Sequence, residues 1–289
     1  MVTVNSLSGG KSSSYIAANY PADYNVFALV RTNDKSCLYP DEKLRQVVSD
    51  KIGMEFIGTL EQDNIIKVML DLEQFIGKEI TWLSPKTFDE VINNPSITGK
   101  NGKQYLPNMM TRYCTTEMKI KPIFKWWQKV INEIVEMRIG FRANEQSRAK
   151  SMIKKTNKNG NSVLKTIIGK SKTGNRNKWG EVEWQKPVFP LIKDAIFKDN
   201  IVEYWKDKPV RFAWMNNCVG CFHKSPMLLK KMWEKHPTKL EWFAKRERES
   251  INGATWRSDV TYDQVKSWNS QFELFDEDFD ECDSGYCGL

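Results

Sequence analysis

The chain begins with an alternating apolar segment that runs directly into a turn rich in glycine and serine. Residues 2–7 alternate apolar and polar positions as a β-strand does. Two adjacent glycines then permit a tight turn and a close approach of a ligand to the backbone. The serines that follow are typical of a helix start, where N–H groups and the helix dipole favour an anion. This order predicts a phosphate-binding loop formed by Ser8, Gly9, Gly10, Lys11, Ser12 and Ser13.

The predicted loop is not a Walker A loop. Gly10-Lys11-Ser12 matches the end of that motif, but the first glycine of the motif would fall at position 5, which is Asn5. Two interpretations are left open by the loop alone. It is either a shorter phosphate loop or an ordinary glycine turn that precedes a helix.

The loop resembles the SGGxDS-type loop of the PP-loop ATP pyrophosphatase superfamily, with Ser12 where many members carry Asp. This superfamily includes sulfonucleotide (PAPS) reductases, tRNA-thiolating enzymes and the sulfur-transfer component of DNA phosphorothioation. The resemblance implies an adenine nucleotide alpha hydrolase-like α/β fold, in which helices cover both faces of a parallel sheet. It also implies ATP or PAPS as the ligand, Lys11 as a catalytic residue, and Mg if ATP is cleaved.

The rest of the first half alternates between segments with the period of a β-strand and segments with the period of an α-helix. This alternation predicts a parallel sheet with helices on both faces. The expected strands are 24–32, 54–60 and 135–141, and the expected helices are 41–52, 64–79 and 116–134. A further helix begins at Ser225-Pro226, where Ser is a good N-cap and Pro a good first residue. Composition divides the chain into a nucleotide-binding domain over 1–149, a basic flexible insert over 150–186, a completing region with cysteines and helices over 187–270, and an acidic mobile tail over 271–289.

The insert is strongly basic within a chain of net charge +8. Eleven basic residues lie between positions 148 and 186, against the two acids Glu181 and Glu183. A basic block of this kind binds a polyanion or forms a solvated loop. We expect a flexible hairpin or loop over 150–180 that contacts nucleic acid, with Trp179 and Trp184 packed rather than stacked on bases.

A second anion-binding segment follows the strand expected at 135–141. Gly140-Phe141-Arg142-Ala143-Asn144-Glu145-Gln146-Ser147-Arg148 resembles the GIRAxES..R segment of the reductases and phosphorothioation enzymes. A guanidinium at the carboxyl end of a strand can bind a phosphate or sulfate through two hydrogen bonds. We therefore expect Arg142 and Arg148 to face the anion as catalytic residues, with Glu145 orienting an arginine or a ribose hydroxyl. A surface ion pair among the three is the alternative.

The cysteines predict a metal site. Cys218 and Cys221 form a CxxC, and Cys114 at a predicted helix start is the best third ligand. The order Cys114, Pro122, CxxC is similar to that of reductases with an iron–sulfur cluster, whose doubled first cysteine is replaced here by Tyr113. The resemblance implies a [4Fe-4S] cluster, with zinc as the alternative and Cys37 or His223 as a fourth ligand.

The end of the chain carries a further pair of thiols. Sulfonucleotide reductases end in a mobile ECGLH-type tail whose cysteine attacks sulfur, and Cys287-Gly288-Leu289 is similar to it. The resemblance makes Cys287 a catalytic candidate. An acidic tail without a catalytic role is the alternative, because the residues from 271 onward contain seven acids and no base.

Three functions compete. The first is ATP-pyrophosphatase-type sulfur transfer to a nucleic acid or nucleotide, supplied by a sulfur donor protein. The second is reduction of PAPS or APS through Cys287 with a thioredoxin-like reductant. The third is a catalytically inactive nucleotide-binding regulatory module. No stretch approaches 18 apolar residues and no secretory signal is evident, so we expect a cytoplasmic protein that does not contact a membrane.

Overall fold

The computed structural model describes residues 1–98, 105–171, 174 and 176–268. The chain forms two compact units, each built from three separate stretches. The first unit contains residues 1–27, 71–81 and 123–210, and the second contains 28–70, 82–122 and the chain from 211 onward. The four consecutive divisions expected from composition stay a prediction.

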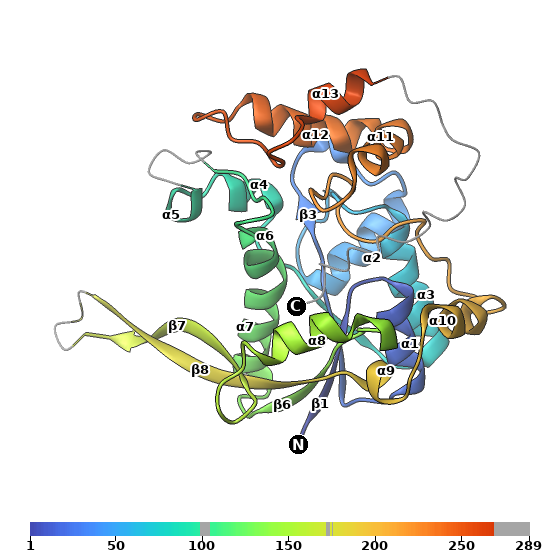
Figure 1. The fold of residues 1–289 in the computed structure, drawn as a ribbon, viewed down its shortest axis with the longest axis vertical. Helices are drawn as coiled ribbons and strands as arrows, with labels where there is room; N and C mark the ends of the chain where they lie inside the picture. Colours follow the sequence, from blue (N-terminus) through green and yellow to red (C-terminus); the bar gives the residue numbers. More distant parts are fainter. Residues whose placement is uncertain (99–104, 172–173, 175, 269–289) are drawn as a thin grey trace. The chain divides into compact units, whose positions relative to one another are not determined.

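A six-stranded sheet with the order β5-β2-β1-β6-β8-β7 organises the fold (Figure 1). β1 runs parallel to both β2 and β6, and β6 runs parallel to β8. β7 is antiparallel to its neighbour β8. The expected α/β class is therefore confirmed, with a mostly parallel sheet where a parallel one was expected. The strands are β1 Thr3–Leu7, β2 Tyr24–Ala28, β5 Ile80–Leu83, β6 Val135–Arg138, β7 Ser162–Lys170 and β8 Asn177–Val188.

The helices begin where the sequence offers caps. The Asp41 side chain accepts a hydrogen bond from the Leu44 N–H at 3.1 Å, and Ser225 accepts one from the Leu228 N–H at 3.3 Å. These two helix starts confirm the prediction. The helices are α1 Lys11–Asn19, α2 Glu42–Ile52, α3 Asn64–Ile76, α4 Phe88–Ile92, α5 Pro95–Thr98, α6 Tyr113–Thr115, α7 Lys121–Val130, α8 Gln146–Ile153, α9 Pro190–Lys193, α10 Lys198–Trp205, α11 Pro226–Lys235, α12 Pro237–Arg248 and α13 Tyr262–Ser267, with 3-10 turns η1 Lys35–Cys37 and η3 Ala143–Glu145 and a π-turn η2 Thr116–Ile120.

Several expected elements differ from those observed. The helix expected at 116–134 ends at Val130, and the strand expected at 135–141 ends at Arg138. The strand expected at 24–32 divides into β2 and a separate β3, Arg31–Thr32, which pairs antiparallel with β4, Gly58–Thr59. Of the strand expected at 54–60, only Gly58 and Thr59 form a strand. The backbone of Gly58 lies against Cys37, where a Cβ would overlap the Cys37 carbonyl oxygen. The helix expected to reach residue 79 ends near Gly77, whose φ is +60°, and β5 follows unpredicted.

The basic segment forms a hairpin that joins the main sheet. β7 and β8 pair with each other, and the last residues of β8 pair with β6. Trp184 of β8 is 2% exposed and packs against Phe124 and Trp127 with ring centroids 5.5 and 6.2 Å apart. Trp179 is 58% exposed, so the prediction that it packs is wrong. Among the described residues, no helix has the length and apolar character needed to cross a membrane.

Candidate functional site

The β1–α1 turn has the backbone geometry of an anion-binding loop. Gly9 has a φ of +75°, in the left-handed region that favours glycine. Gly10 is the N-cap of α1 and gives the first turn no side-chain cap. The first amides of a helix have no carbonyl partner within that helix. The turn therefore directs backbone N–H donors and the positive end of the α1 dipole toward an anion.

Ser13 fixes the shape of this turn from within. Its hydroxyl donates to the carbonyl oxygen of Gly10 at 3.0 Å and accepts from the Ser8 N–H at 3.2 Å. The two serine hydroxyls are also 3.2 Å apart. On the opposite side of the helix start, the Trp205 indole N–H donates to the Lys11 carbonyl oxygen at 3.1 Å. The loop is thus held by two side chains before any ligand binds, which lowers the entropy cost of binding.

The end of β6 lies directly against this turn. A Cβ on Gly140 would be 3.0 Å from the backbone nitrogen of Ser13 and 3.2 Å from its Cα. β1 and β6 are adjacent parallel strands, seen side by side in Figure 1, so their carboxyl ends share one edge of the sheet. α1 leads from β1 to β2 on one side, while β6 lies on the other. Such a reversal of strand order is where open α/β sheets bind ligands.

The three charged residues predicted after β6 form one group. Glu145 accepts from the backbone N–H of Arg142 at 2.8 Å and from its Nε at 3.2 Å. The other carboxylate oxygen accepts from Nη1 of Arg148, whose guanidinium lies 4.1 Å from the centre of the Phe141 ring. Two guanidinium groups share one carboxylate, so the group carries a net charge of about +1 at neutral pH.

This group differs from an ordinary surface ion pair in its burial. The side chain of Arg142 is 8% exposed and that of Glu145 is 11% exposed. Phe141 stacks on Phe189 with the ring centroids 5.4 Å apart, and the Ala143 N–H donates to the Ile196 carbonyl oxygen at 2.9 Å. Packing therefore holds both arginines in place beyond the strand end. Glu145 orients them, and guanidinium groups suit a phosphate or sulfate.

The three cysteines predicted as metal ligands line one cavity of the second unit. Its volume is about 40 Å³, and Cys114, Cys218, Cys221 and His223 all border it, together with the cations Arg112 and Lys119. Cys114 belongs to α6, and the CxxC lies in the loop before α11. Cys37 does not border this cavity; it is 3% exposed and its sulfur lies 3.9 Å from the Ser36 hydroxyl. The structure thus brings together three of the four predicted cysteines.

The pKa values of two thiols of this cavity, Cys114 and Cys218, are raised above the ordinary value. Burial raises the pKa of Cys114 to about 11. Burial and the nearby Glu61 raise the pKa of Cys218 well above its usual value. Burial lowers the pKa of His223 to about 4, which keeps the imidazole neutral and able to bind a metal. A soft metal or cluster would reverse the thiol shifts, because its charge stabilises thiolates.

The donor chemistry fits such a group, since sulfur and imidazole are the usual ligands of zinc and iron–sulfur clusters. As the side chains stand, however, no set of three or more His, Cys, Asp or Glu within the described ranges could hold a metal ion. The metal therefore stays a prediction. Cys287 lies outside the described residues.

The loop that carries the CxxC is held by side chains that sequence reasoning missed. Lys224 is 0% exposed and donates from Nζ to the carbonyl oxygens of Cys218 at 2.8 Å and Asn216 at 3.3 Å. Arg257 donates to the carbonyls of Phe222 and Lys224 at 2.7 and 2.8 Å. Proximity of Lys224 to Cys221 was visible in the sequence. The burial of Lys224 could not be seen in the sequence, because a lysine side chain is almost always exposed unless its ammonium group is paired.

Two further side chains complete this support. The Tyr262 hydroxyl donates to the Gly220 carbonyl at 2.8 Å, and Gln62 donates to the Met215 carbonyl at 2.7 Å. The backbone also adds a contact, from the Val219 N–H to the Leu60 carbonyl at 2.7 Å. A loop with so many carbonyls occupied has little freedom left, so the positions of both cysteine backbones are determined by tertiary structure.

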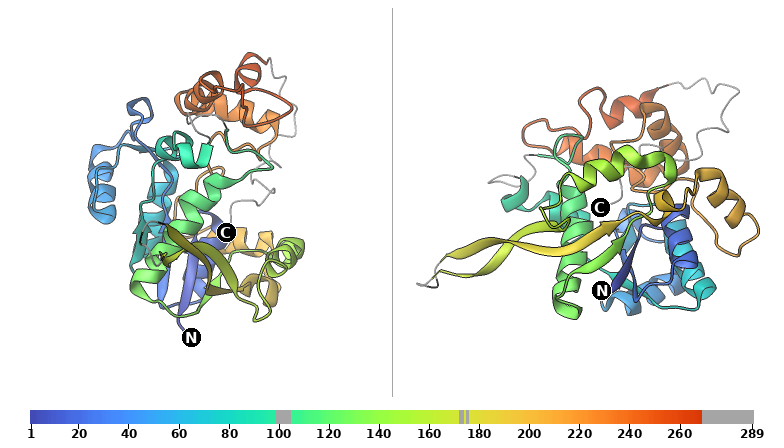
Figure 2. Two further views of the ribbon diagram at one scale, coloured as in Figure 1. Left: turned by 90° about the vertical axis from the view of Figure 1, so that its left-hand side faces the viewer. Right: turned by 60° about the horizontal axis from the view of Figure 1, so that its bottom comes forward.

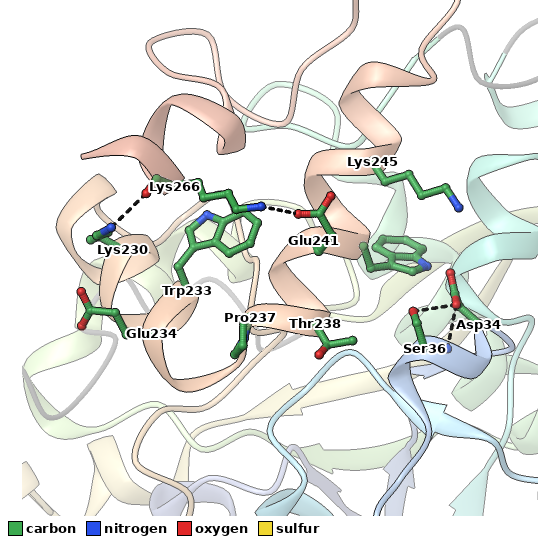
Figure 3. A pocket seen from close by; sticks show the side chains of 11 residues that line it. Asp34, Ser36, Lys230, Trp233, Glu234, Pro237, Thr238, Glu241, Lys245 and Lys266 are labelled. Carbon is green, nitrogen blue, oxygen red and sulfur yellow. Dashed lines mark hydrogen bonds and ion pairs between the residues drawn. The ribbon is translucent and has the colours of Figure 1, made fainter. Parts of the chain in front are cut away.

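A larger cavity of about 670 Å³ lies among α11, α12, α13 and η1 (Figure 3). Its walls include Trp233 and Pro237. Lys266 and Glu241 of its lining are 2.9 Å apart, and Lys230 donates to the Lys266 carbonyl at 3.0 Å. Three lysines and three acids border it, so it has no excess charge that would select a ligand.

Comparison of the chain with protein-family models, with curated proteins and with solved structures gives no match. The PP-loop resemblance therefore rests on the residues themselves.

Proposed function

We propose that this protein is an adenine-nucleotide-binding PP-loop enzyme that cleaves ATP to activate a nucleic acid or nucleotide for sulfur transfer. One observation carries the proposal. The β1–α1 turn, with the amide donors of a helix start, lies against Gly140, and the buried Arg142–Glu145–Arg148 group follows two residues later. Two anion-binding elements thus belong to adjacent ends of parallel strands. A nucleotide phosphate chain is the ligand that fits both.

Each residue has a role in this proposal. The amides after Gly10 bind phosphate oxygens, and Lys11 at the first position of α1 supplies a point charge for the leaving pyrophosphate. Arg142 and Arg148 stabilise charge on the α-phosphate, and Glu145 holds their orientation. Mg²⁺ would neutralise the pyrophosphate if ATP is the substrate.

The proposed reaction has two displacements. A substrate oxygen attacks the α-phosphorus of ATP, the bond to pyrophosphate breaks, and an adenylated substrate forms. A persulfide on a donor protein then displaces AMP through its outer sulfur, and a second thiol of the donor attacks the disulfide so formed. This releases the thiolated substrate and leaves the donor protein with a disulfide. The site's part is positioning and electrostatic stabilisation, which is the usual source of rate enhancement in phosphoryl chemistry.

The test is calorimetric titration of the full chain with ATP, AMP and PAPS. Gly10 has a φ of −93°, so valine suits its backbone but blocks close approach of a phosphate. We expect Gly10→Val to abolish ATP binding in a folded protein. Gly169→Val is the matched control, because Gly169 has open space around its Cβ position. Unchanged ATP affinity in Gly10→Val would refute the site. Binding of PAPS but not ATP would favour the reductase instead.

A further inference from the structure

The far half of the β7–β8 hairpin is a bare two-stranded ribbon. Only Gln185–Val188 of β8 pair with β6, so within the described residues 177–184 pair with β7 alone. Figures 1 and 2 show both strands continuing past the end of β6. An isolated two-stranded ribbon is marginally stable in water. The ribbon is nevertheless formed, and among its described residues both long edges are unpaired. Unpaired strand edges of this kind indicate a surface that binds a partner.

Large apolar side chains are exposed on this ribbon. Ile167 and Trp179 face each other across the strands and are 46% and 58% exposed. Directly opposite residues of a pair share one face, so these two form a single apolar contact point. The neighbouring Ile168 lies at the irregularity in the strand pairing, and its side chain is 50% exposed. Three exposed large apolar residues so close together mark an interaction site.

Basic residues flank this apolar point. Lys165 lies two positions before Ile167, and Lys170 pairs with Asn177 beyond it. Lys178 directly precedes Trp179 on the other strand, and Arg176 lies just before that strand begins. All four of these basic residues are exposed, and Glu181 is the only acid between positions 164 and 182. An apolar centre within a basic ribbon matches a polyanion with apolar groups inside its grooves.

We infer that this ribbon, residues 164–170 and 176–182, docks in the major groove of double-stranded DNA. The groove of B-DNA is about 12 Å wide and admits a two-stranded β-ribbon, whereas the major groove of duplex RNA is too narrow. The four basic residues contact phosphates on the groove walls. Ile167 and Trp179 contact base edges, where the thymine methyl group is the apolar partner. This inference deepens the proposed function by naming the substrate class, and it does not depend on ATP binding.

The probe is a fluorescein-labelled DNA duplex of about 20 base pairs, about two turns of B-DNA. Its binding to the full chain is followed by fluorescence anisotropy at several salt concentrations. Each lost phosphate contact flattens the slope of log K against log salt by about 0.9. We expect Lys165→Ser, Lys170→Ser, Arg176→Ser and Lys178→Ser, combined in one variant, to flatten the slope by about 3 to 4. Trp179→Ala should weaken binding about tenfold without changing the slope, because it removes no charge.

The control is a second variant, which loses the same number of positive charges elsewhere in the first unit. Its serine substitutions are at four exposed lysines, Lys125, Lys129, Lys193 and Lys206. It should leave the slope within about one unit of the original. The inference would be overturned if the control variant flattened the salt slope as much as the ribbon variant does. It would also be overturned if the ribbon variant had the same salt slope as the original protein. Equal or tighter binding of the matching single strand or RNA duplex would also overturn it. Circular dichroism checks the fold, and the ATP titration, run separately, reports on the proposed function alone.

Discussion

Gly140 lies so close to the start of α1 that a Cβ added to it would be 3.0 Å from the backbone nitrogen of Ser13. The distance concerns two segments more than a hundred residues apart in the chain. The three atoms nearest to the missing Cβ are all backbone atoms, which cannot move aside as a flexible side chain can. Because of this short distance, the segment at the end of β6 forms part of the wall of the β1–α1 loop.

Gly140→Ala should therefore damage the loop more than the fold. We expect ATP affinity to fall at least tenfold and the unfolding free energy to drop by about 1–3 kcal/mol, as overpacking does. Gly169→Ala is the matched control, since nothing lies within 4 Å of its Cβ position. Calorimetry and denaturant unfolding measure the two effects. Normal ATP affinity in Gly140→Ala would show that the wall does not shape the binding site.

The metal prediction concerns the cavity of the second unit. Changing Cys114, Cys218 or Cys221 to Ser should each remove the metal, because a three-thiolate set cannot lose one member without a large loss of affinity. Cys37→Ser should keep it, since Cys37 does not border the cavity. Metal analysis and the absorption spectrum of anaerobically purified protein measure the result. Full occupancy in Cys114→Ser would require other partners for the CxxC.

Lys224 should be essential for the CxxC loop without contacting a ligand. Lys224→Met keeps the length of the side chain but leaves the carbonyls of Cys218 and Asn216 without their donor. Each such loss costs about 1–3 kcal/mol. We expect a lower melting temperature and faster reaction of the cysteines with a thiol reagent. Lys245→Met, at an exposed position, should change neither. A Lys224→Met protein as stable as the original would disprove the role.

Glu247 should make stability depend on pH. Burial raises its pKa from 4.5 to about 7, although its carboxylate accepts from the N–H groups of Trp256 and Tyr262 at 3.0 and 2.7 Å. Between these two pH values the folded state binds more protons, so unfolding free energy falls as pH rises. The change is on the order of 3 kcal/mol.

The difference between the original protein and Glu247→Gln isolates this effect. Glutamine does not titrate, so the stability of the original relative to the variant should decline from pH 4.5 to 7 and then stay level. Urea unfolding at several pH values measures it. A constant difference across that range would show that Glu247 keeps its ordinary pKa.

The sequence by itself determined the elements whose causes are local. The strand before Ser8, the glycine turn and the helix starts at Asp41 and Ser225 depend on neighbouring residues, and their propensities are visible in the chain. The segment from Gly140 to Arg148 could be identified as a charged group for the same reason. Each arginine lies three positions from Glu145, so Glu145 reaches both.

Tertiary structure alone decided what depends on residues far apart. The apolar run from Tyr24 to Thr32 gave no sign that β3 would leave the main sheet to pair with β4, because that pairing depends on Gly58 and its backbone contact with Cys37. The sequence ranked Cys114 above Cys37 as a ligand but left Cys37 a candidate, and only Cys114 borders the cavity of the CxxC. Burial of Lys224 and exposure of Trp179 likewise oppose the usual preferences of those residues. Burial depends on how the whole chain packs, so the preferences of single residue types do not predict it.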